Sequence, residues 1–295
     1  MQSEISEIAN RIRELREVCD YSTAQLAKEL GISEETYIGY ETEGNFPIRT
    51  ELGSQLRAYF VAKPGCVLVD ADYSQIELRL MAHFSGDHAL VEAFRTGQDV
   101  HARTASEIFD VPLDEVDSTL RSRAKAVNFG LIYGISGFGL AKNTGVSRQE
   151  AQEFINRYFA KYPGVKGFMD SAAEDGQHNG YALTLMGRRR YLPELKSDKA
   201  VVREFGKRAA MNTPVQGTAA DIIKIAMIKV WKALKEEGLK SRLILQVHDE
   251  LLVETAQEEE ARVREILTEN MKSAADLAVT LEIDLHTGNN WYEAK

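Results

Sequence analysis

The sequence of 295 residues is poor in the features that mark secreted and membrane proteins. Its two cysteines, Cys19 and Cys66, are too few for a disulfide framework and predict a reducing, cytoplasmic setting. No apolar run reaches the length of about 18 residues that a membrane-spanning helix needs, so we expect no membrane partner. The charged, amphipathic N-terminus excludes a secretory signal. What remains is an ordinary globular composition, with 44% hydrophobic and 27% charged residues.

The net charge of −9 is unevenly distributed along the chain. Residues 118–232 hold 19 basic and 9 acidic residues, which gives +10, whereas the segments before and after this block are acidic. A negative net charge by itself argues against a nucleic-acid partner. The basic block fits either a solvated helical surface or a site that binds phosphates beside carboxylates that hold cations.

The N-terminal segment predicts three short helices. Apolar residues recur at the helical period over residues 5–15. Ser22 or Thr23 can cap a second helix, Gly31 can form a turn, and Ser33 can cap a third helix. Two helices joined by a tight glycine turn are typical of a helix-turn-helix.

Leu15 to Gly44 resembles the Cro/lambda-repressor-like helix-turn-helix family, which implies a small, truncated all-α module in residues 1–46. The helix from Ser33 to Tyr40 would then enter the major groove of DNA. However, it begins with Glu34 and Glu35, which repel phosphates. A helical interaction module and a working DNA reader both stay open as interpretations.

Beyond residue 46 the pattern becomes mixed α/β, with apolar runs typical of strands and longer periodic segments typical of helices. Strands are expected at Cys66–Asp72, around Tyr181–Tyr191, and at Leu243–Val247, Leu251–Thr255 and Thr280–His286. Helices are expected from near Gln75 to about Gln177, from Lys199 to Glu237, and between the last two strands.

Carboxylates interrupt two of these apolar segments. Asp72 ends the first strand, and Asp249 and Glu250 lie between the two strands of an apolar hairpin. Aspartate is common in turns, so a turn role is one interpretation. A buried carboxylate is unfavourable unless it is paired, and two such sites in one chain favour metal ligands. Hard oxygen donors favour Mg²⁺ over Zn²⁺.

A mixed stripe follows one predicted helix. Arg121, Lys125, Phe129 and Tyr133 are spaced by four residues and drift by about 40° per step, so they share one slanted face. Two cations followed by two rings form either a solvated helix with an aromatic core end or a ligand surface. As a ligand surface, the cations would meet a polyphosphate and the rings a sugar and a base.

Three segments resemble the sequence motifs of the family A DNA polymerases, the bacterial DNA polymerase I type. They are motif A at Asp72–Arg79, motif B at Arg121–Gly134 and motif C at Gln246–Glu250. Further similarity covers Gly187–Leu195, Asn212–Ile222 and the terminal NWYEAK. The resemblance implies a polymerase palm, with an antiparallel sheet, and helical fingers in residues 47–295. It also implies DNA primer–template and deoxynucleoside triphosphates (dNTPs) as partners.

The resemblance implies catalytic roles for Asp72, Asp249, Glu250 and Lys125. Asp72 and Asp249, completed by the main-chain carbonyl of Tyr73, would hold two Mg²⁺ ions for in-line phosphoryl transfer to a primer 3′ end. Glu250 would support the site without being an obligatory ligand.

The nucleotide-binding residues implied by the resemblance include the motif B stripe. The cations and His101 would grip the triphosphate, the two rings would close over the sugar and base, and Glu77 would exclude a ribose 2′-hydroxyl. The full set is Tyr73, Gln75, Glu77, His101, Arg121, Lys125, Phe129 and Tyr133.

A DNA-binding set is implied as well. Arg208 and Gln216 would donate to minor-groove acceptors that all correct base pairs share. The full set is Arg79, Arg208, Asn212, Gln216 and His248. Arg188, Arg189 and Arg190 fit either a phosphate-binding role or a solvated turn.

Family A polymerases carry a region before motif A that supplies the thumb. Here a helix-turn-helix stands in its place, so we expect no thumb and weak, distributive synthesis or none. The competing hypothesis is a non-catalytic DNA-binding or regulatory protein that uses Leu15–Gly44, and a third is a non-functional fusion product. The sequence does not indicate an oligomeric state.

Overall fold

The structure is a computed structural model, and its contacts divide the chain into two compact units, Met1–Leu68 with His286–Lys295 and Val69–Leu285. The expected domain boundary after residue 46, the first predicted helix and the Gly31 turn lie outside the described residues. The motif residues lie in the larger unit. The structure describes residues 13, 22–29, 33–43 and 56–295.

Two predicted helices of the smaller unit are confirmed, α2 (Thr23–Glu29) and α3 (Glu34–Glu43). The Ser22 hydroxyl accepts from the backbone N–H of Gln25 at 3.1 Å, as an N-cap does. The hydroxyl of Ser33 accepts from the N–H of Thr36 at 3.1 Å and caps the next helix in the same way.

Trp291, near the C-terminus, is buried within the smaller unit. The Trp291 backbone N–H donates to the carbonyl of Phe60 at 2.9 Å, just after the short helix η1 (Leu56–Tyr59). The Phe60 ring meets the indole edge-to-face at 5.5 Å, and the Arg57 guanidinium lies 5.2 Å from its centroid. These contacts give the NWYEAK segment a structural role.

The predicted mixed α/β architecture is confirmed, and it contains a four-stranded antiparallel sheet. The strands follow the order β4-β5-β1-β6, so that β1 and β5 are internal and almost fully buried. Their bounds are β1 (Cys66–Tyr73), β4 (Arg242–Val247), β5 (Glu250–Ala256) and β6 (Ile283–Gly288). The last strand begins later than predicted, because the Thr280 carbonyl accepts from Arg79 at 2.6 Å, outside the sheet ladder.

The helices predicted between β1 and the later strands of the sheet are also present. Side chains of Asp87, Asp99, Asp117, Ser136 and Ser147 cap five of them by accepting from backbone N–H groups. None of the described helices is both long and apolar enough to cross a membrane. They are α5 (Ile76–Ser85), α6 (His88–Arg95), α7 (Val100–Phe109), α8 (Ser118–Ile132), α9 (Gly137–Thr144), α10 (Arg148–Lys161) and α11 (Pro163–Asn179), followed later by α13 (Glu260–Lys272).

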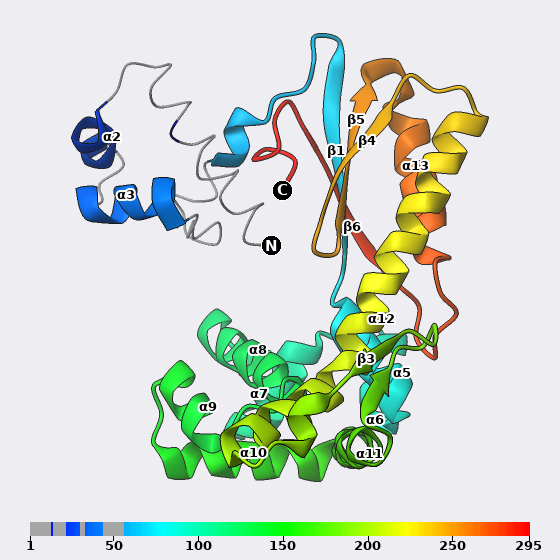
Figure 1. Cartoon of the computed structure of the whole chain (residues 1–295). Helices are drawn as coiled ribbons and strands as arrows, with labels where there is room; N and C mark the ends of the chain where they lie inside the picture. Colours follow the sequence, from blue (N-terminus) through cyan, green and yellow to red (C-terminus); the bar gives the residue numbers. More distant parts are fainter. Residues whose placement is uncertain (1–12, 14–21, 30–32, 44–55) are drawn as a thin grey trace. The chain divides into compact units, whose positions relative to one another are not determined.

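One long helix, α12 (Ala200–Glu236), connects the helical part of the larger unit to the sheet. It contacts α11 and α5 near one end and β4 and α13 near the other (Figure 1). Pro214 lies inside this helix, where it lacks the N–H that would bond to the preceding turn. The hairpin of β2 (Tyr181–Leu183) and β3 (Arg189–Tyr191) also packs on α12.

Candidate nucleotidyl-transfer site

The larger unit contains an open pocket of about 400 Å³ where the sheet meets α5, α7 and α8. Most of the residues predicted from motifs A, B and C line this pocket, although they are far apart in the sequence. The lining residues are Asp72, Tyr73, Ser74, Gln75, Ile76, Glu77, His101, Arg121, Lys125, Phe129, Asp249 and Asp284.

The two aspartates of the pocket are brought together by the sheet. Asp72 lies near the end of β1, and Asp249 lies in the two-residue turn between β4 and β5. The backbone N–H of Tyr73 donates to the Asp249 carbonyl at 3.2 Å, which fixes one segment against the other. His248 holds this turn with a left-handed φ of 52°, which non-glycine residues seldom adopt. Glu250 begins β5 and is buried, with 5% of its surface exposed.

A second strained turn follows Asp72. Gln75 precedes α5 with φ 55° and ψ 42°, and its side-chain Oε1 is buried without a hydrogen-bond partner among the described residues. The backbone N–H of Ser74 donates to the Glu282 carbonyl at 2.8 Å, which holds the turn against the segment before β6. Backbone strain of this kind concentrates at functional sites.

Arg79, which the resemblance places in the DNA-binding set, lies in the interior of the larger unit. Only 8% of it is exposed, and its guanidinium donates to the carbonyls of Ser74 at 2.8 Å and Thr280 at 2.6 Å. It also stacks 4.7 Å from the ring of Phe94. Burial lowers the pKa of Arg79, while Glu282 and Asp284 oppose this shift. These bonds brace the turn that follows β1, and a contact of Arg79 with DNA stays a prediction.

The stripe predicted on α8 has the expected orientation. Arg121 and Lys125 are exposed and Phe129 and Tyr133 are half-buried. The opposite face of the helix packs inward through Ala124, Val127, Asn128, Leu131 and Ile132. The cations therefore stand at the pocket while the rings continue the same face toward the interior.

Arg121 is held by an aspartate that the sequence analysis did not single out. Its Nε lies 2.6 Å from Oδ2 of Asp99, and both side chains are partly exposed. Asp99 also caps α7, accepting from the N–H groups of His101 and Ala102. Partial burial opposes ionisation of Asp99, but the bonds from Arg121 and from these amides lower its pKa overall.

If the pocket binds the triphosphate that the motif B stripe predicts, replacing Asp99 by asparagine is expected to strengthen that binding. Asparagine is also a good N-cap, so α7 keeps its cap while Arg121 loses the competing charge. We expect the KM for a dNTP in steady-state primer extension to fall by roughly two- to fivefold, the effect of one exposed ion pair. The matched control is Asp117→Asn, which alters the cap of α8 in the same manner. If the KM of Asp99→Asn is unchanged or higher, Asp99 does not compete with the triphosphate for Arg121.

His101 lines the pocket but is almost fully buried, with 2% of its surface exposed. Its Nδ1 lies 3.0 Å from Nδ2 of Asn128, whose Oδ1 lies 3.2 Å from the Thr104 hydroxyl. Burial lowers the pKa of His101 to about 4, with Arg121 and Lys125 adding to the shift and Asp99 opposing it. The imidazole is therefore neutral near pH 7 and can serve the pocket only through hydrogen bonding.

Glu77 and Tyr133 connect α5 to the end of α8. The Tyr133 hydroxyl donates to the Glu77 carboxylate. The Phe129 ring stacks near the Tyr133 ring, with centroids 6.5 Å apart and planes 27° apart. The Tyr133 hydroxyl thus ties the Glu77 carboxylate, which lines the pocket, to the end of α8.

The predicted DNA-binding residues of α12 form a stripe of their own. Arg208, Asn212 and Gln216 follow at four-residue spacing, with the first and last exposed and Asn212 half-buried. Gly134, with φ 70°, packs directly against this helix, because a Cβ there would lie 3.2 Å from Cγ of Arg208. The stripe thus begins beside the end of α8.

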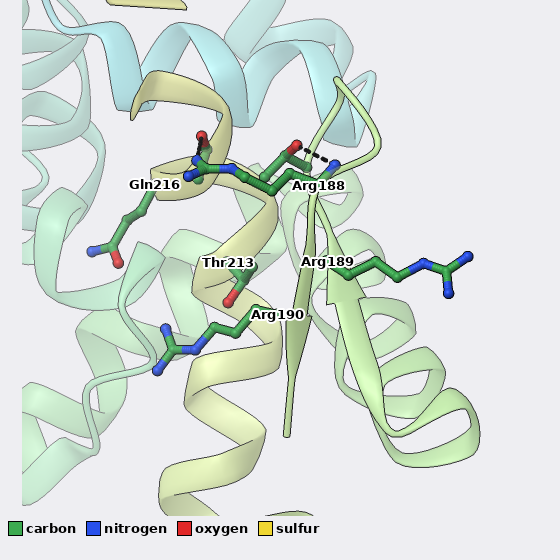
Figure 2. A pocket seen from close by; sticks show the side chains of 7 residues that line it. Arg188, Arg189, Arg190, Thr213 and Gln216 are labelled. Carbon is green, nitrogen blue, oxygen red and sulfur yellow. Dashed lines mark hydrogen bonds between the residues drawn. The ribbon is translucent and has the colours of Figure 1, made fainter. Parts of the chain in front are cut away.

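The three consecutive arginines of the β2–β3 hairpin have different surroundings (Figure 2). Arg188 donates to the Gly217 carbonyl at 2.9 Å and pairs with Asp221 at 2.9 Å, so it fastens the hairpin to α12. Arg189 points to the other side, 4.8 Å from the Tyr181 ring. Arg190 points to the same side as Gln216, into a second pocket of about 180 Å³. Alternation along the strand explains the opposite directions.

One lining residue, Asp284, and two residues that contact lining side chains, Asn128 and Asp99, were not predicted from the sequence. Asp284 contributes a further carboxylate from β6, outside the three motifs. Asn128 lies within motif B but has no charge or ring, and Asp99 precedes His101 as an ordinary helix cap. The only sequence signal for Asp284 is the alternation of Glu282 and Asp284 in a short strand.

The described residues include no cluster of three or more His, Cys, Asp or Glu side chains arranged as a metal site. The pocket instead offers the carboxylates of Asp72 and Asp249 and the main chain of Tyr73, whose N–H donates to the Asp249 carbonyl. All are hard oxygen donors at the mouth of an open pocket. They fit Mg²⁺, which keeps several waters and is bound by one or two carboxylates together with substrate phosphates.

Comparison with known proteins gives close relatives. The chain is 50% identical over 251 residues to DNA polymerase I of Caldicellulosiruptor bescii, covering 85% of this chain and 30% of that protein. It is 51% identical over 252 residues to DNA polymerase I of Geobacillus stearothermophilus, covering 85% of this chain and 29% of that protein. The chain thus spans about 30% of the length of these relatives.

A solved structure matches the fold as well. It is the POL domain of Pol1 from M. smegmatis in complex with DNA primer-template and dNTP, with a TM-score of 0.81 and 47% identity. The match covers 86% of this chain and 45% of that chain. Residues 44–293 match the family described as DNA polymerase family A, so α2 and α3 lie outside the match and the helix-turn-helix stays a prediction. The chain belongs to DNA polymerase family A.

Proposed function

We propose that this chain carries the nucleotidyl-transfer site of a DNA-directed DNA polymerase. The observation that carries the proposal is the pocket in which Asp72 and Asp249, from the sheet, face Arg121 and Lys125, from α8. Carboxylates suited to divalent cations therefore stand opposite cations suited to a triphosphate. The reaction would join the primer O3′ to the α-phosphorus of a dNTP and release pyrophosphate.

Asp72, Asp249 and the main-chain carbonyl of Tyr73 would hold two Mg²⁺ ions. Bound there, the ions would supply Lewis acidity, which favours the alkoxide form of the primer hydroxyl and neutralises charge on the phosphates. Glu250 is buried at the start of β5 and would keep the hairpin turn in place, whereas His248 in that turn would lie near the primer terminus.

The protein cations would orient the triphosphate. Arg121 and Lys125 would bind phosphate oxygens through charge-assisted hydrogen bonds, and Lys125 would face the charge that develops on the leaving pyrophosphate. Arg121 would exchange its Asp99 partner for phosphate. His101 would add a neutral donor, and Gln75 would contribute the amide that it holds in the pocket.

The aromatic end of the pocket would recognise the sugar and the base. Phe129 and Tyr133 offer ring faces for the nascent base pair, and base–aromatic stacking contributes about 1–3 kcal/mol per base. Glu77, tied to the Tyr133 hydroxyl, would occupy the space that a ribose 2′-hydroxyl needs.

Changing Glu77 to alanine is expected to weaken discrimination against ribonucleotides. The substitution removes the carboxylate that Tyr133 holds in place and opens space beside the sugar. We expect the ratio of kcat/KM for a dNTP to that for the matching ribonucleotide to fall by roughly 10- to 100-fold, because steric exclusion is lost. Tyr133→Phe, which removes only the hydrogen bond, is the matched control and should have a smaller effect. If Glu77→Ala and the wild type discriminate equally against ribonucleotides, Glu77 does not exclude the 2′-hydroxyl.

The duplex would lie along α12. Arg208, Asn212 and Gln216 present donors on one stripe, and minor-groove acceptors recur at every correct base pair. Arg190 stands beside Gln216 and would add a phosphate contact, while Arg188 holds the hairpin in place.

Primer extension by the full chain tests the proposal. With protein in molar excess over a labelled primer–template, and with Mg²⁺ and dNTPs, we expect template-dependent addition of nucleotides. Chelation of the metal by EDTA should stop the reaction, and renewed Mg²⁺ should restore it. If circular dichroism shows that the protein is folded and it still extends no primer under these conditions, the proposal is wrong.

A DNA-reading role for the N-terminal helices is a weaker candidate. Glu34 and Glu35 are exposed at the start of α3, where a DNA reader would approach phosphates. A gel-shift series with random and selected duplexes, using the full chain and a chain lacking residues 1–46, tests that role directly.

A further inference from the structure

A buried chain of polar side chains leads from α7 to the nucleotide pocket. Asn128 is fully buried on α8, and Thr104 and His101 are buried on α7. The Asn128 amide lies between them, with Nδ2 at 3.0 Å from Nδ1 of His101 and Oδ1 at 3.2 Å from the Thr104 hydroxyl. A buried amide of this kind is costly unless both of its ends are satisfied, so the three side chains form one unit.

The unit determines which nitrogen of His101 carries the proton. A neutral imidazole has one N–H donor and one acceptor. If the Asn128 amide donates to Nδ1, then Nδ1 is the acceptor and the proton must lie on Nε2. Nε2 makes no hydrogen bond with any described residue, and His101 lines the pocket shared with Arg121 and Lys125. The tautomer therefore decides whether the pocket meets an N–H donor or a lone pair.

The Thr104 hydroxyl determines the direction of the hydrogen bonds that run through Asn128 to His101. Its single proton has two acceptors in reach, the Val100 carbonyl at 2.8 Å and Asn128 Oδ1 at 3.2 Å. When the proton goes to Asn128, the amide nitrogen faces His101 and the imidazole is protonated at Nε2. When it goes to Val100, the amide would turn over and His101 would donate from Nδ1 instead, which leaves a lone pair in the pocket.

The charges at the pocket select between these two arrangements. Arg121 and Lys125 place positive charge near His101, and Asp99, which pairs with Arg121 at the start of α7, opposes their effect. A triphosphate between these cations presents oxygen acceptors, which a lone pair on Nε2 would repel and an N–H would bind. Protonation of the His101 imidazole is disfavoured, because burial and the charges of Arg121 and Lys125 oppose a positive charge on the ring.

We propose that Asn128 is a positioning residue that fixes His101 as the neutral Nε2–H tautomer and so presents a hydrogen-bond donor to the triphosphate. The inference rests on the proposed function, since it assigns a role within the same nucleotide site. It gives Asn128 no contact with substrate; its effect passes through His101. In metal sites, the hydrogen-bond partner of a ligating histidine fixes its tautomer in the same way.

The first test is spectroscopic and needs neither catalysis nor DNA. In the full chain with ¹⁵N-labelled histidine, the His101 signals are identified by their loss in His101→Gln. We expect the shift pattern of a neutral Nε2–H imidazole at pH 7, which persists as the pH falls to about 5 because protonation is disfavoured. In Thr104→Val, which keeps the side-chain shape but removes the hydroxyl, we expect a mixture of tautomers. A His101 ring that is protonated at Nδ1 in the wild type would overturn the proposal.

The second test is a double-mutant cycle in primer extension. Asn128→Leu should raise the KM for a dNTP by roughly five- to tenfold, with kcat and primer–template binding unchanged within twofold. In the His101→Gln background the same substitution should have no further effect, because Asn128 acts only through His101. A loss of equal size in both backgrounds would assign Asn128 a merely structural role and refute the proposal. Thr104→Val provides the same comparison if Asn128→Leu fails to fold.

The two tests also separate this inference from the proposed function. An active polymerase whose His101 is the Nδ1–H tautomer refutes the role of Asn128 alone. A chain that extends no primer, yet shows the Nε2–H tautomer and a dNTP-induced shift of His101 that Asn128→Leu abolishes, refutes the polymerase activity and supports the positioning role.

Discussion

Replacing Asp249 by alanine is expected to reduce primer extension by at least about a thousandfold. Asp249 and Asp72 are the two pocket carboxylates that we propose as metal ligands, and the backbone bond from the Tyr73 N–H to the Asp249 carbonyl holds the Asp249 turn against β1. Loss of a metal that stabilises transition-state charge costs several kcal/mol, and each 1.36 kcal/mol is about tenfold in rate. Single-turnover extension with saturating Mg²⁺ and dNTP measures this loss at the chemical step.

The control must show that the loss is local. Asp276→Ala removes an exposed carboxylate from the same unit but from outside the pocket, and it should leave the rate unchanged. Asp249→Ala should keep its cooperative thermal transition and should bind primer–template in the absence of divalent ions as well as the wild type does. Extension by Asp249→Ala within tenfold of the wild-type rate would contradict the metal-ligand role.

The elements of the larger unit could be predicted from hydrophobic periodicity because they are long or strongly apolar. The Cys66–Asp72 run became β1 with one added residue, and the expected helix from Lys199 to Glu237 became α12. The antiparallel hairpin around Asp249 was also correct. Period and length therefore determined these elements without tertiary information.

The direction of a charged side chain was harder to predict. Arg79 follows Ile76 by three residues and so lies on the buried face of α5. The helical period contained this signal, yet burying a guanidinium requires acceptors that the sequence cannot reveal. Those acceptors, the carbonyls of Ser74 and Thr280, come from segments about 200 residues apart.

Asn128 illustrates the opposite case. It sits on the inward face of α8 between Val127 and Leu131, so the period places it in the interior correctly. Its partner His101 lies 27 residues away on another helix, and only the packing of α7 against α8 brings them together. Motif matching predicted most of the residues that line the pocket, whereas the contact between Asn128 and His101 depended on tertiary packing.

Lys125→Ala is expected to have the second-largest effect, with a different kinetic signature. Lys125 stands at the pocket on the outer face of α8, where its ammonium group would meet the triphosphate and the charge that grows on the leaving pyrophosphate. A hydrogen bond to a charged group contributes about 1.5–3 kcal/mol, so we expect kcat/KM for a dNTP to fall by roughly 10- to 100-fold. If Lys125 stabilises the transition state as well as the bound nucleotide, kcat must fall along with the rise in KM.

A matched variant on the same helix separates this local effect from the general field of the basic block. Arg123→Ala removes the same unit of charge two residues away, about 200° around α8 and outside the pocket lining. If the block acts only through its net charge, both variants should lose activity equally, and high salt should erase the difference from the wild type. If the position of the ammonium group matters, Arg123→Ala should stay within about threefold of the wild type at any salt concentration, because an exposed charge outside the pocket contributes little. Equal losses in the two variants would therefore refute a specific contact between Lys125 and the nucleotide.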